Sequence, residues 1–125
     1  MNQHNPELAA RYAAPGVIWH GQTLGTVEGV GNLVGVLRGF LAAFPDLHAP
    51  EQDIVAAGQA VALRFVVEGT HQGNMFGLAP TGRRVRWDAV DVYRLADGVI
   101  AEEWAADDAT ALLHQLGAYT PPWLA

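Results

Sequence analysis

The stretch that decides the fold is THQGNMFGLAPTGRRVRWDAVDVYRLADGVIAEEW, residues 70–104. It contains two runs with the alternating pattern of β-strands, separated by Ala96-Asp97-Gly98, which suits a tight hairpin loop. An aspartate interrupts an otherwise apolar and aromatic row, which indicates a carboxyl group on the inner face of a sheet. That row of the first strand consists of Val85, Trp87, Ala89, Asp91, Tyr93 and Leu95.

The hairpin register determines which side chain lies opposite Asp91. A three-residue loop, with Gly98 at its positive-φ position, places Asp91 opposite Glu103 on the same face. Two carboxyl groups at that range cannot both ionise cheaply, so one pKa rises, and such a group can serve as a general acid or base. A two-residue turn instead shifts the register by one residue and places Asp91 opposite Trp104. That alternative favours a structural aspartate bonded to a backbone amide or a tyrosine hydroxyl.

Length and composition limit the class of protein. The chain has 125 residues, which is typical of one domain, and we expect residues 1–125 to form a single domain. Half of the residues are hydrophobic and 16% are charged, which excludes a disordered chain. A net charge of −6 disfavours nucleic acid, and no apolar run reaches the eighteen or so residues of a membrane span. With no cysteine and no secretory leader pattern, a cytoplasmic protein is expected.

The spacing of apolar residues predicts the order of elements. The long helix has a continuous apolar face, but Gly31, Gly35 and Gly39 lower its intrinsic propensity, so packing must stabilise it. A helix followed by antiparallel strands indicates an α+β fold, and a strongly curved antiparallel sheet around one helix leaves a cone-shaped cavity. In chain order we expect a short helix at 6–13, a strand around 17–19, the long helix from 26 or 27 to 44, strands at about 48–56 and 60–69, the hairpin, and a last helical turn or two at 110–116.

Several motifs resemble the SnoaL-like polyketide cyclase family of the nuclear transport factor 2-like superfamily. The resemblance implies a cone-shaped, cofactor-free and usually dimeric protein with its active site inside the cone. It also implies an intramolecular aldol ring closure in which an aspartate acts as acid and base. The motifs are FPDL at 44–47, GTHQG at 69–73, PTGRRVRW at 80–87, DVYR at 91–94, DG at 97–98, EEW at 102–104 and LLHQLG at 112–117.

This chain departs from the family pattern at two places. Many relatives read Glu-His-Trp-Asp where this chain reads Glu102-Glu103-Trp104-Ala105, so the aspartate that serves as the family's acid and base is absent. The acid–base role is therefore expected to move to Asp91, Glu103 or Asp107, the last of which shares their face if the strand continues. The first helix is also shortened, so the cavity is either more open or covered by a partner subunit.

Candidate site residues follow from these patterns. His20 lies just after the first strand, where many relatives also have a histidine, and its ring can donate to a substrate carbonyl. Core packing is the competing explanation for each aromatic residue, and His71 also suits a role in shaping its loop. The candidate catalytic residues are Asp91, Glu103, His20 and Asp107, and the candidate substrate-binding residues are Trp19, Phe65, His71, Phe76, Trp87 and Tyr93. The spacing contains no His-x-x-x-His pair, so no metal site is expected.

We therefore expect a small-molecule pocket protein of the SnoaL-like type. The leading hypothesis is a cofactor-independent acid–base enzyme, of the cyclase, isomerase or lyase type, that acts on a small hydrophobic carbonyl compound. The alternative is a non-catalytic ligand-binding or dimerisation module of the same fold. A homodimer is expected, because the shortened N-terminus, the apolar tail at 120–124 and an open sheet edge expose apolar surface.

Overall fold

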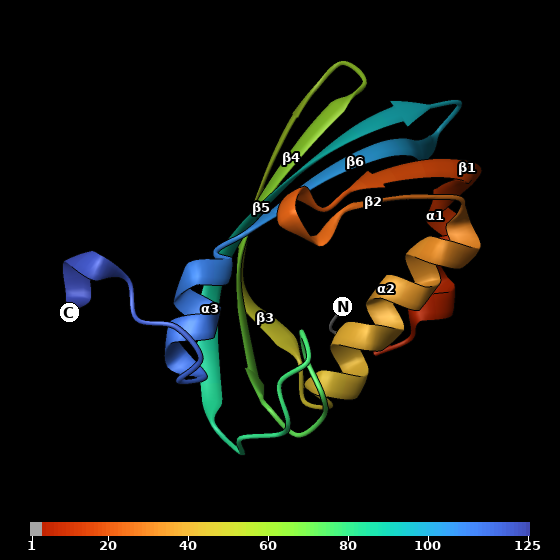
Figure 1. The fold of residues 1–125 in the computed structure, drawn as a ribbon. Coiled ribbons are helices and arrows are strands. Elements are labelled where there is room, and N and C mark those ends of the chain that lie inside the picture. The colour runs from red at the N-terminus through yellow and green to blue at the C-terminus, as the bar shows by residue number, and fades with distance from the viewer. Residues whose placement is uncertain (1–3) are drawn as a thin grey trace.

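The computed structural model describes residues 4–125, which form one curved six-stranded sheet with helices against it (Figure 1). The sheet order is β2-β1-β6-β5-β4-β3. This arrangement confirms the α+β class. The strands are β1 (Ala13–His20), β2 (Thr26–Glu28), β3 (His48–Ala57), β4 (Ala60–Thr70), β5 (Arg84–Ala96) and β6 (Val99–Asp107), and the helices are α1 (Ala9–Tyr12), α2 (Val30–Ala43) and α3 (Ala109–Gln115).

The sheet is mixed, whereas the sequence pattern had predicted an antiparallel one. β1 pairs in parallel with β6, with Trp19 opposite Glu103 and His20 opposite Trp104. The other strand pairs are antiparallel. Alternation predicts strands but not which distant strands pair, so this contact could not be expected. The short strand β2 was also missed, because its residues had been assigned to the start of the long helix.

The β5–β6 hairpin has a different register from the one expected. Its turn has two residues, Asp97 and Gly98, with φ angles of 52° and 79°, the conformation of a type I′ turn. A bulge then follows between the pairs Arg94–Glu102 and Leu95–Ile100. The turn and the bulge each shift the register by one residue relative to the expected hairpin. The residue of β6 that lies opposite a given residue of β5 therefore changes by two positions, and the same side chains still face inward.

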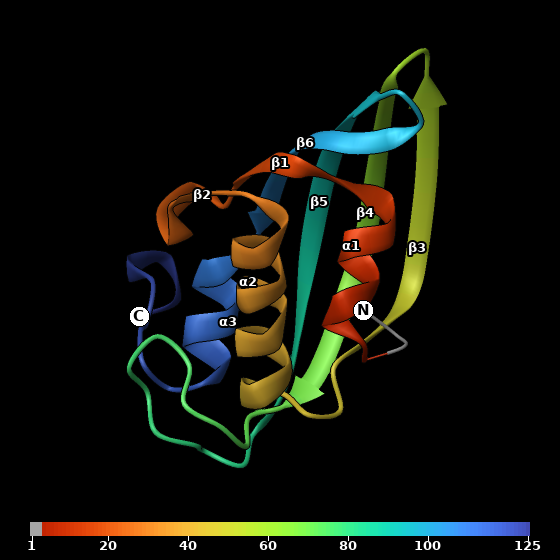
Figure 2. The same cartoon turned by 90° about the vertical axis from the view of Figure 1, so that its right-hand side faces the viewer.

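Helix α2 covers the concave face of the sheet, and α1 lies beside it (Figure 2). The buried residues of α2 include Leu33 and Val34. Phe44, which follows α2, lies in the core and contacts Trp87 at 5.5 Å between ring centroids.

Among residues 4–125, no helix is long and apolar enough to span a membrane.

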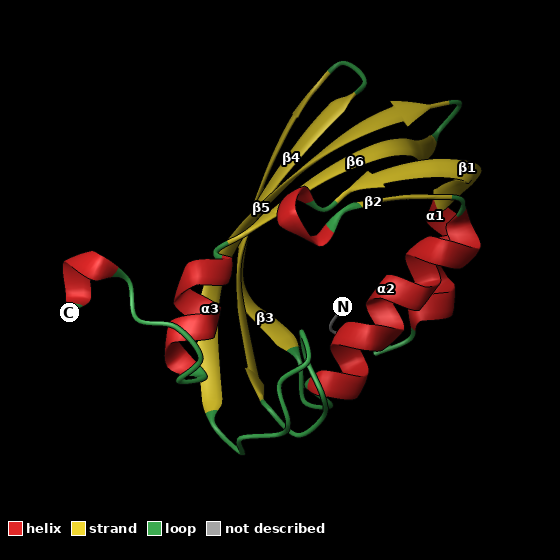
Figure 3. Ribbon diagram, in the orientation of Figure 1, coloured by secondary structure: helices red, strands yellow, loops and turns green. Residues whose placement is uncertain are grey.

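Helix α3 closes the exposed edge of β5 beyond the end of β6. The Gln115 side chain accepts a hydrogen bond from the Arg86 backbone N–H at 2.7 Å and donates one to the Arg86 carbonyl at 2.6 Å. Its amide group therefore satisfies two backbone groups that β6 no longer reaches. The segment after α3 projects away from the sheet (Figure 3).

The Gly35→Ala substitution should stabilise the protein. Gly35 lies inside α2, is exposed, and has open space where a Cβ would stand. Alanine is favoured over glycine in a helix interior by up to about 1 kcal/mol. We therefore expect the free energy of unfolding, measured by urea denaturation, to rise by about 0.5–1 kcal/mol. The control Gly29→Ala should lose stability, because Gly29 has a φ of 93°. Destabilisation by Gly35→Ala would contradict the exposed position of this helix face.

Candidate functional site

A cavity lies between α2, the N-terminal segment and the concave face of the sheet. It has two adjoining chambers of about 100 and 540 Å³, which we call the Trp87 chamber and the Tyr93 chamber after a residue that lines only one of them. The residues that line both chambers are Asn5, Trp19, Leu37, Phe65, Asp91 and Glu103. Asp91 and Glu103 thus lie where the chambers meet.

The observed register determines how the carboxyl groups face one another. Asp91 lies opposite Ala105, and Glu103 lies opposite Tyr93, so the expected direct pairing of Asp91 with Glu103 is wrong. The alternative pairing of Asp91 with Trp104 is wrong as well. Asp91 and Glu103 are instead diagonal neighbours on the inner face, and hydrogen bonding between them shifts the pKa of both groups.

Asp91 is buried and only partly hydrogen-bonded. The residue as a whole is 7% exposed. The Tyr93 hydroxyl donates to its Oδ2 at 3.2 Å, whereas Oδ1 is buried without a hydrogen-bond partner among the described residues. An unpartnered buried carboxylate oxygen is unfavourable in a protein interior, so the charge of Asp91 is poorly compensated by the residues around it.

Burial separates the protonation states of this pair. Desolvation raises the pKa of Asp91 to about 6, and the charge of Asp107 adds to the rise, against opposing hydrogen bonds from Glu103 and Tyr93. Desolvation also raises the pKa of Glu103, to about 9, followed by its hydrogen bond with Asp91 and the charge of that group. Near neutral pH, Asp91 is therefore the base and Glu103 the acid of a coupled pair.

Tyr93 and Asp107 complete the polar part of the cavity. Desolvation, followed by the charges of Glu103 and Asp91, raises the pKa of Tyr93, so its hydroxyl remains a donor. Strand β6 continues to Asp107, which the sequence could only predict conditionally. Burial raises the pKa of Asp107, and the Trp87 indole opposes this by donating to its Oδ1 at 2.9 Å.

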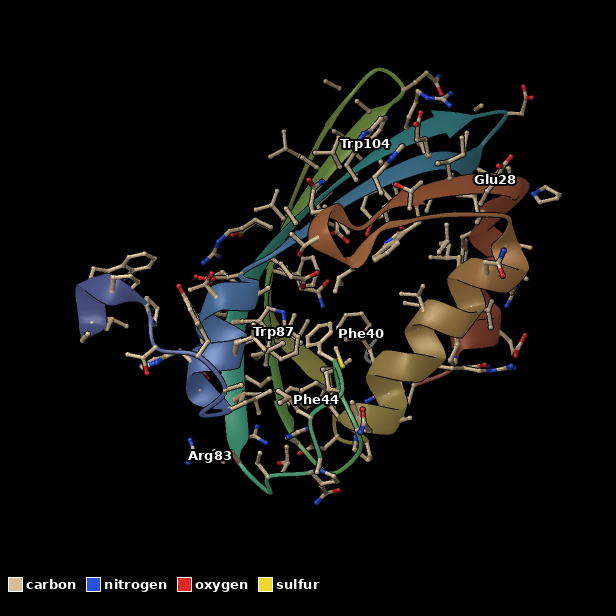
Figure 4. The ribbon with its side chains drawn as sticks, viewed as in Figure 1. Glu28, Phe40, Phe44, Arg83, Trp87 and Trp104 are labelled. Carbon is tan, nitrogen blue, oxygen red and sulfur yellow. The ribbon has the colours of Figure 1, made fainter. Side chains whose placement is uncertain are left out.

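Four of the predicted aromatic residues line the cavity. Trp19 and Phe65 line both chambers, Trp87 lines one and Tyr93 lines the other. Figure 4 shows Trp87 in the interior together with Phe40 from α2, a lining residue that the prediction had not included. Phe40 belongs to the apolar stripe of α2, and such a stripe indicates a core position without showing that it borders a cavity.

His20 lies outside the cavity, so the expectation that it polarises a substrate there is wrong. Its Nε2 is 2.6 Å from Glu102 Oε2, and its ring stacks on Trp104 at 5.2 Å between centroids. Because side chains alternate along a strand, the inward position of Trp19 turns His20 to the outer face. The same alternation turns Trp104 away from the interior (Figure 4).

His71 and Phe76 do not line either chamber, which corrects their prediction as substrate-binding residues. His71 is fully buried, and its Nδ1 is bonded to the Thr81 backbone N–H at 3.1 Å and hydroxyl at 3.0 Å. It therefore shapes the loop between β4 and β5. Phe76 is 44% exposed, with a φ of 53° in a turn of that loop.

The cavity offers acid–base chemistry on an apolar molecule. A carboxylate, a carboxylic acid and a phenol share its polar side, and aromatic and aliphatic side chains form the remainder. Within residues 4–125, no three His, Asp or Glu side chains converge as a metal site would require. The polar lining residues Asn5 and Gln52 were not predicted, because nothing in their local sequence distinguishes them from surface residues.

Comparison with known proteins identifies the family of this architecture. The family model for SnoaL-like polyketide cyclases matches residues 1–116. The chain is 30% identical over 112 residues to the nogalonic acid methyl ester cyclase of Streptomyces nogalater, covering 90% of this chain and 79% of that protein. It is 29% identical to the aklanonic acid methyl ester cyclase DnrD of Streptomyces peucetius, covering 90% and 74%. The crystal structure of AclR from Streptomyces galilaeus matches with a TM-score of 0.83 and 32% identity, covering 96% of this chain and 79% of AclR.

The Asp91→Asn substitution should stabilise the protein at neutral and alkaline pH. The folded-state pKa of Asp91 is raised above its unfolded value of about 4, so its stabilising contribution is present below pH 4 and is lost as pH rises through about 6. Removing the charge should recover on the order of 2–3 kcal/mol at pH 8 and almost nothing at pH 4.

Thermal melts of the variant and the parent between pH 4 and 8 measure this difference. Asp88→Asn is the matched control, because Asp88 lies on the same strand but faces outward and is exposed. A variant that is less stable than the parent at pH 8 would mean that Asp91 is a structural hydrogen-bond acceptor.

Proposed function

Because the chain belongs to the SnoaL-like polyketide cyclase family, we propose that it is a cofactor-independent acid–base enzyme that acts on a hydrophobic carbonyl compound. The observation that supports this most strongly is the pair formed by buried Asp91 and half-buried Glu103 on the wall shared by both chambers. Their different environments favour one proton on the pair at neutral pH, held by Glu103. Such a pair can remove a proton and supply another without any further group.

The proposed reaction is an intramolecular carbonyl condensation. Asp91 removes a proton from the carbon next to a carbonyl, which leaves an enolate. The enolate carbon then bonds to a second carbonyl carbon of the same molecule, and the resulting alkoxide takes the proton of Glu103. Substrate and product are isomers, so the proton on Asp91 must return to Glu103, and their proximity allows this transfer within the site.

The position of Ala105 supports a displaced catalytic aspartate. The resemblance to relatives indicates that many of them carry an aspartate where this chain has Ala105. Ala105 lies directly opposite Asp91 and lines the same chamber. A carboxyl group on β5 thus reaches the region of the cavity that a carboxyl group on β6 would otherwise occupy.

Ala105 also favours a second candidate function, which is a non-catalytic protein that binds a hydrophobic molecule in the same cavity. In that case the carboxyl groups determine which molecule binds but transfer no proton. The enzyme converts its substrate, whereas the binding protein does not. Moving the carboxyl group from position 91 to position 105 should restore turnover only if the protein is an enzyme.

Turnover can be tested with nogalonic acid methyl ester and aklanonic acid methyl ester, whose cyclases are relatives of this chain. Chromatography separates each ester from its cyclised isomer. We expect the parent to cyclise at least one ester, Asp91→Asn to lose about 100-fold or more, and Glu103→Gln to lose about 10-fold or more. The double variant Asp91→Asn/Ala105→Asp should regain part of the rate, because it restores one carboxyl group across the same strand pair.

If the parent cyclises neither ester and exchanges no α-proton of either ester in deuterated water, the result contradicts the proposed acid–base function on such esters and favours the non-catalytic one. Equal rates for the parent and Asp91→Asn would also exclude Asp91 as the base.

We also propose that the chain forms a homodimer through the outer face of the sheet. Val90, Val92 and Trp104 are 46%, 39% and 37% exposed on that face. Their apolar surface would be covered by the same surface of a second copy. Sedimentation equilibrium at high micromolar concentration should give a dimer, and Val92→Arg should shift it toward a monomer. A monomeric parent protein would contradict this assembly.

A further inference from the structure

Among residues 4–125, the arginine and histidine side chains lie outside the two chambers. The chain contains seven arginines and no lysine. Neither an arginine nor a histidine is among the residues that line the two chambers. Arg38, Arg64, Arg84, Arg86 and Arg94 form ion pairs with Glu7, Asp53, Asp46, Glu68 and Glu102, while Arg83 donates to the Gln115 carbonyl and Arg11 lies over the Tyr12 ring.

The cavity itself combines acidic and aromatic groups. Asp91, Glu103 and Asp107 line the Trp87 chamber, beside Trp19 and other aromatic side chains. The buried Oδ1 of Asp91 has no hydrogen-bond partner in the described part of the chain. A ligand that carries a positive charge would compensate the charge of the Asp91 carboxylate, which lines both chambers. The aromatic faces attract cations as well.

We propose that the cavity selects organic cations, namely amines attached to an apolar body, and rejects carboxylates of the same shape. The ammonium group pairs with the Asp91 carboxylate at the junction of the two chambers, and the apolar body lies against Trp19 and Phe65. This inference rests on the same cavity as the proposed function and deepens it by naming the charge of the ligand. A carboxylate there would meet acidic groups with no cation to balance its charge.

The pH dependence follows from the groups around Asp91. The titratable groups that face it are Glu103 and Asp107 on β6 and Tyr93 on its own strand. β4 presents Leu63 and Phe65, β1 presents Trp19, α2 presents Leu37, and the N-terminal segment presents Asn5, none of which is charged. Ammonium binding therefore requires ionised Asp91, and affinity should rise between pH 5 and 7.5.

Three probes with one ring system separate charge from shape: 2-naphthylmethylamine, 2-naphthylmethanol and 2-naphthoic acid. Isothermal titration calorimetry of the full chain at pH 7.5 should show the amine binding at least ten-fold more tightly than the alcohol, with no detectable binding of the acid. At pH 5 the preference for the amine should fall several-fold. Asp91→Asn should remove the preference for the amine over the alcohol.

The outer-face variant Asp88→Asn controls for the general negative charge of the chain, and it should retain the preference for the amine. The inference is overturned if the amine and the alcohol bind equally, if the acid binds most tightly, if no probe binds at millimolar concentration, or if Asp91→Asn keeps the preference.

None of the probes carries a carbonyl with an adjacent acidic C–H, so binding and turnover are measured independently. Cyclisation of an ester without amine preference would refute only the charge selection. Amine preference without cyclisation or proton exchange would refute only the acid–base function.

Discussion

The pairing of β5 with β6 is the interaction on which the site depends. Its two-residue turn and its bulge together keep Asp91, Glu103 and Asp107 on the concave face. A single-residue shift without the bulge would turn one strand's carboxyl groups outward, because side chains alternate along a strand. The cavity chemistry therefore depends on the short segment around Gly98 and Ala101, which also contributes Ile100 to the lining of the Tyr93 chamber.

Placing Asp91, Glu103 and Asp107 in a poorly solvated cavity lowers the stability of the fold. The surrounding residues reduce this loss in different ways. Tyr93 and Trp87 each donate a hydrogen bond to a carboxylate, and Glu103 retains its proton. Within the described part of the chain, Oδ1 of Asp91 has no hydrogen-bond partner. The outer face shows the opposite arrangement, because there the acidic groups pair with arginines that remain in water. The sheet thus separates a solvated charge network from a poorly solvated one across its thickness.

Much of the fold was predictable because it depends on local patterns. Alternation identified the inner row of β5, and the apolar stripe identified α2, since both depend on which residues become buried. The faces of Asp91, Glu103 and Asp107 were predicted correctly for the same reason. Their partners across the hairpin were not, because the turn type and the bulge depend on small backbone preferences. The parallel contact of β1 with β6 required the tertiary structure, whereas alternation alone places the adjacent residues Trp19 and His20 on opposite faces.

The pairing of the first long strand with the last one has a consequence for how the protein folds. Trp19 on β1 lies opposite Glu103 on β6, and both belong to the wall shared by the two chambers. The ends of a long loop must meet before these contacts form, and such pairings slow folding because the entropy of loop closure comes first. During synthesis, β1 must therefore wait until β6 has left the ribosome, so the cavity is completed only after Asp107 has been made.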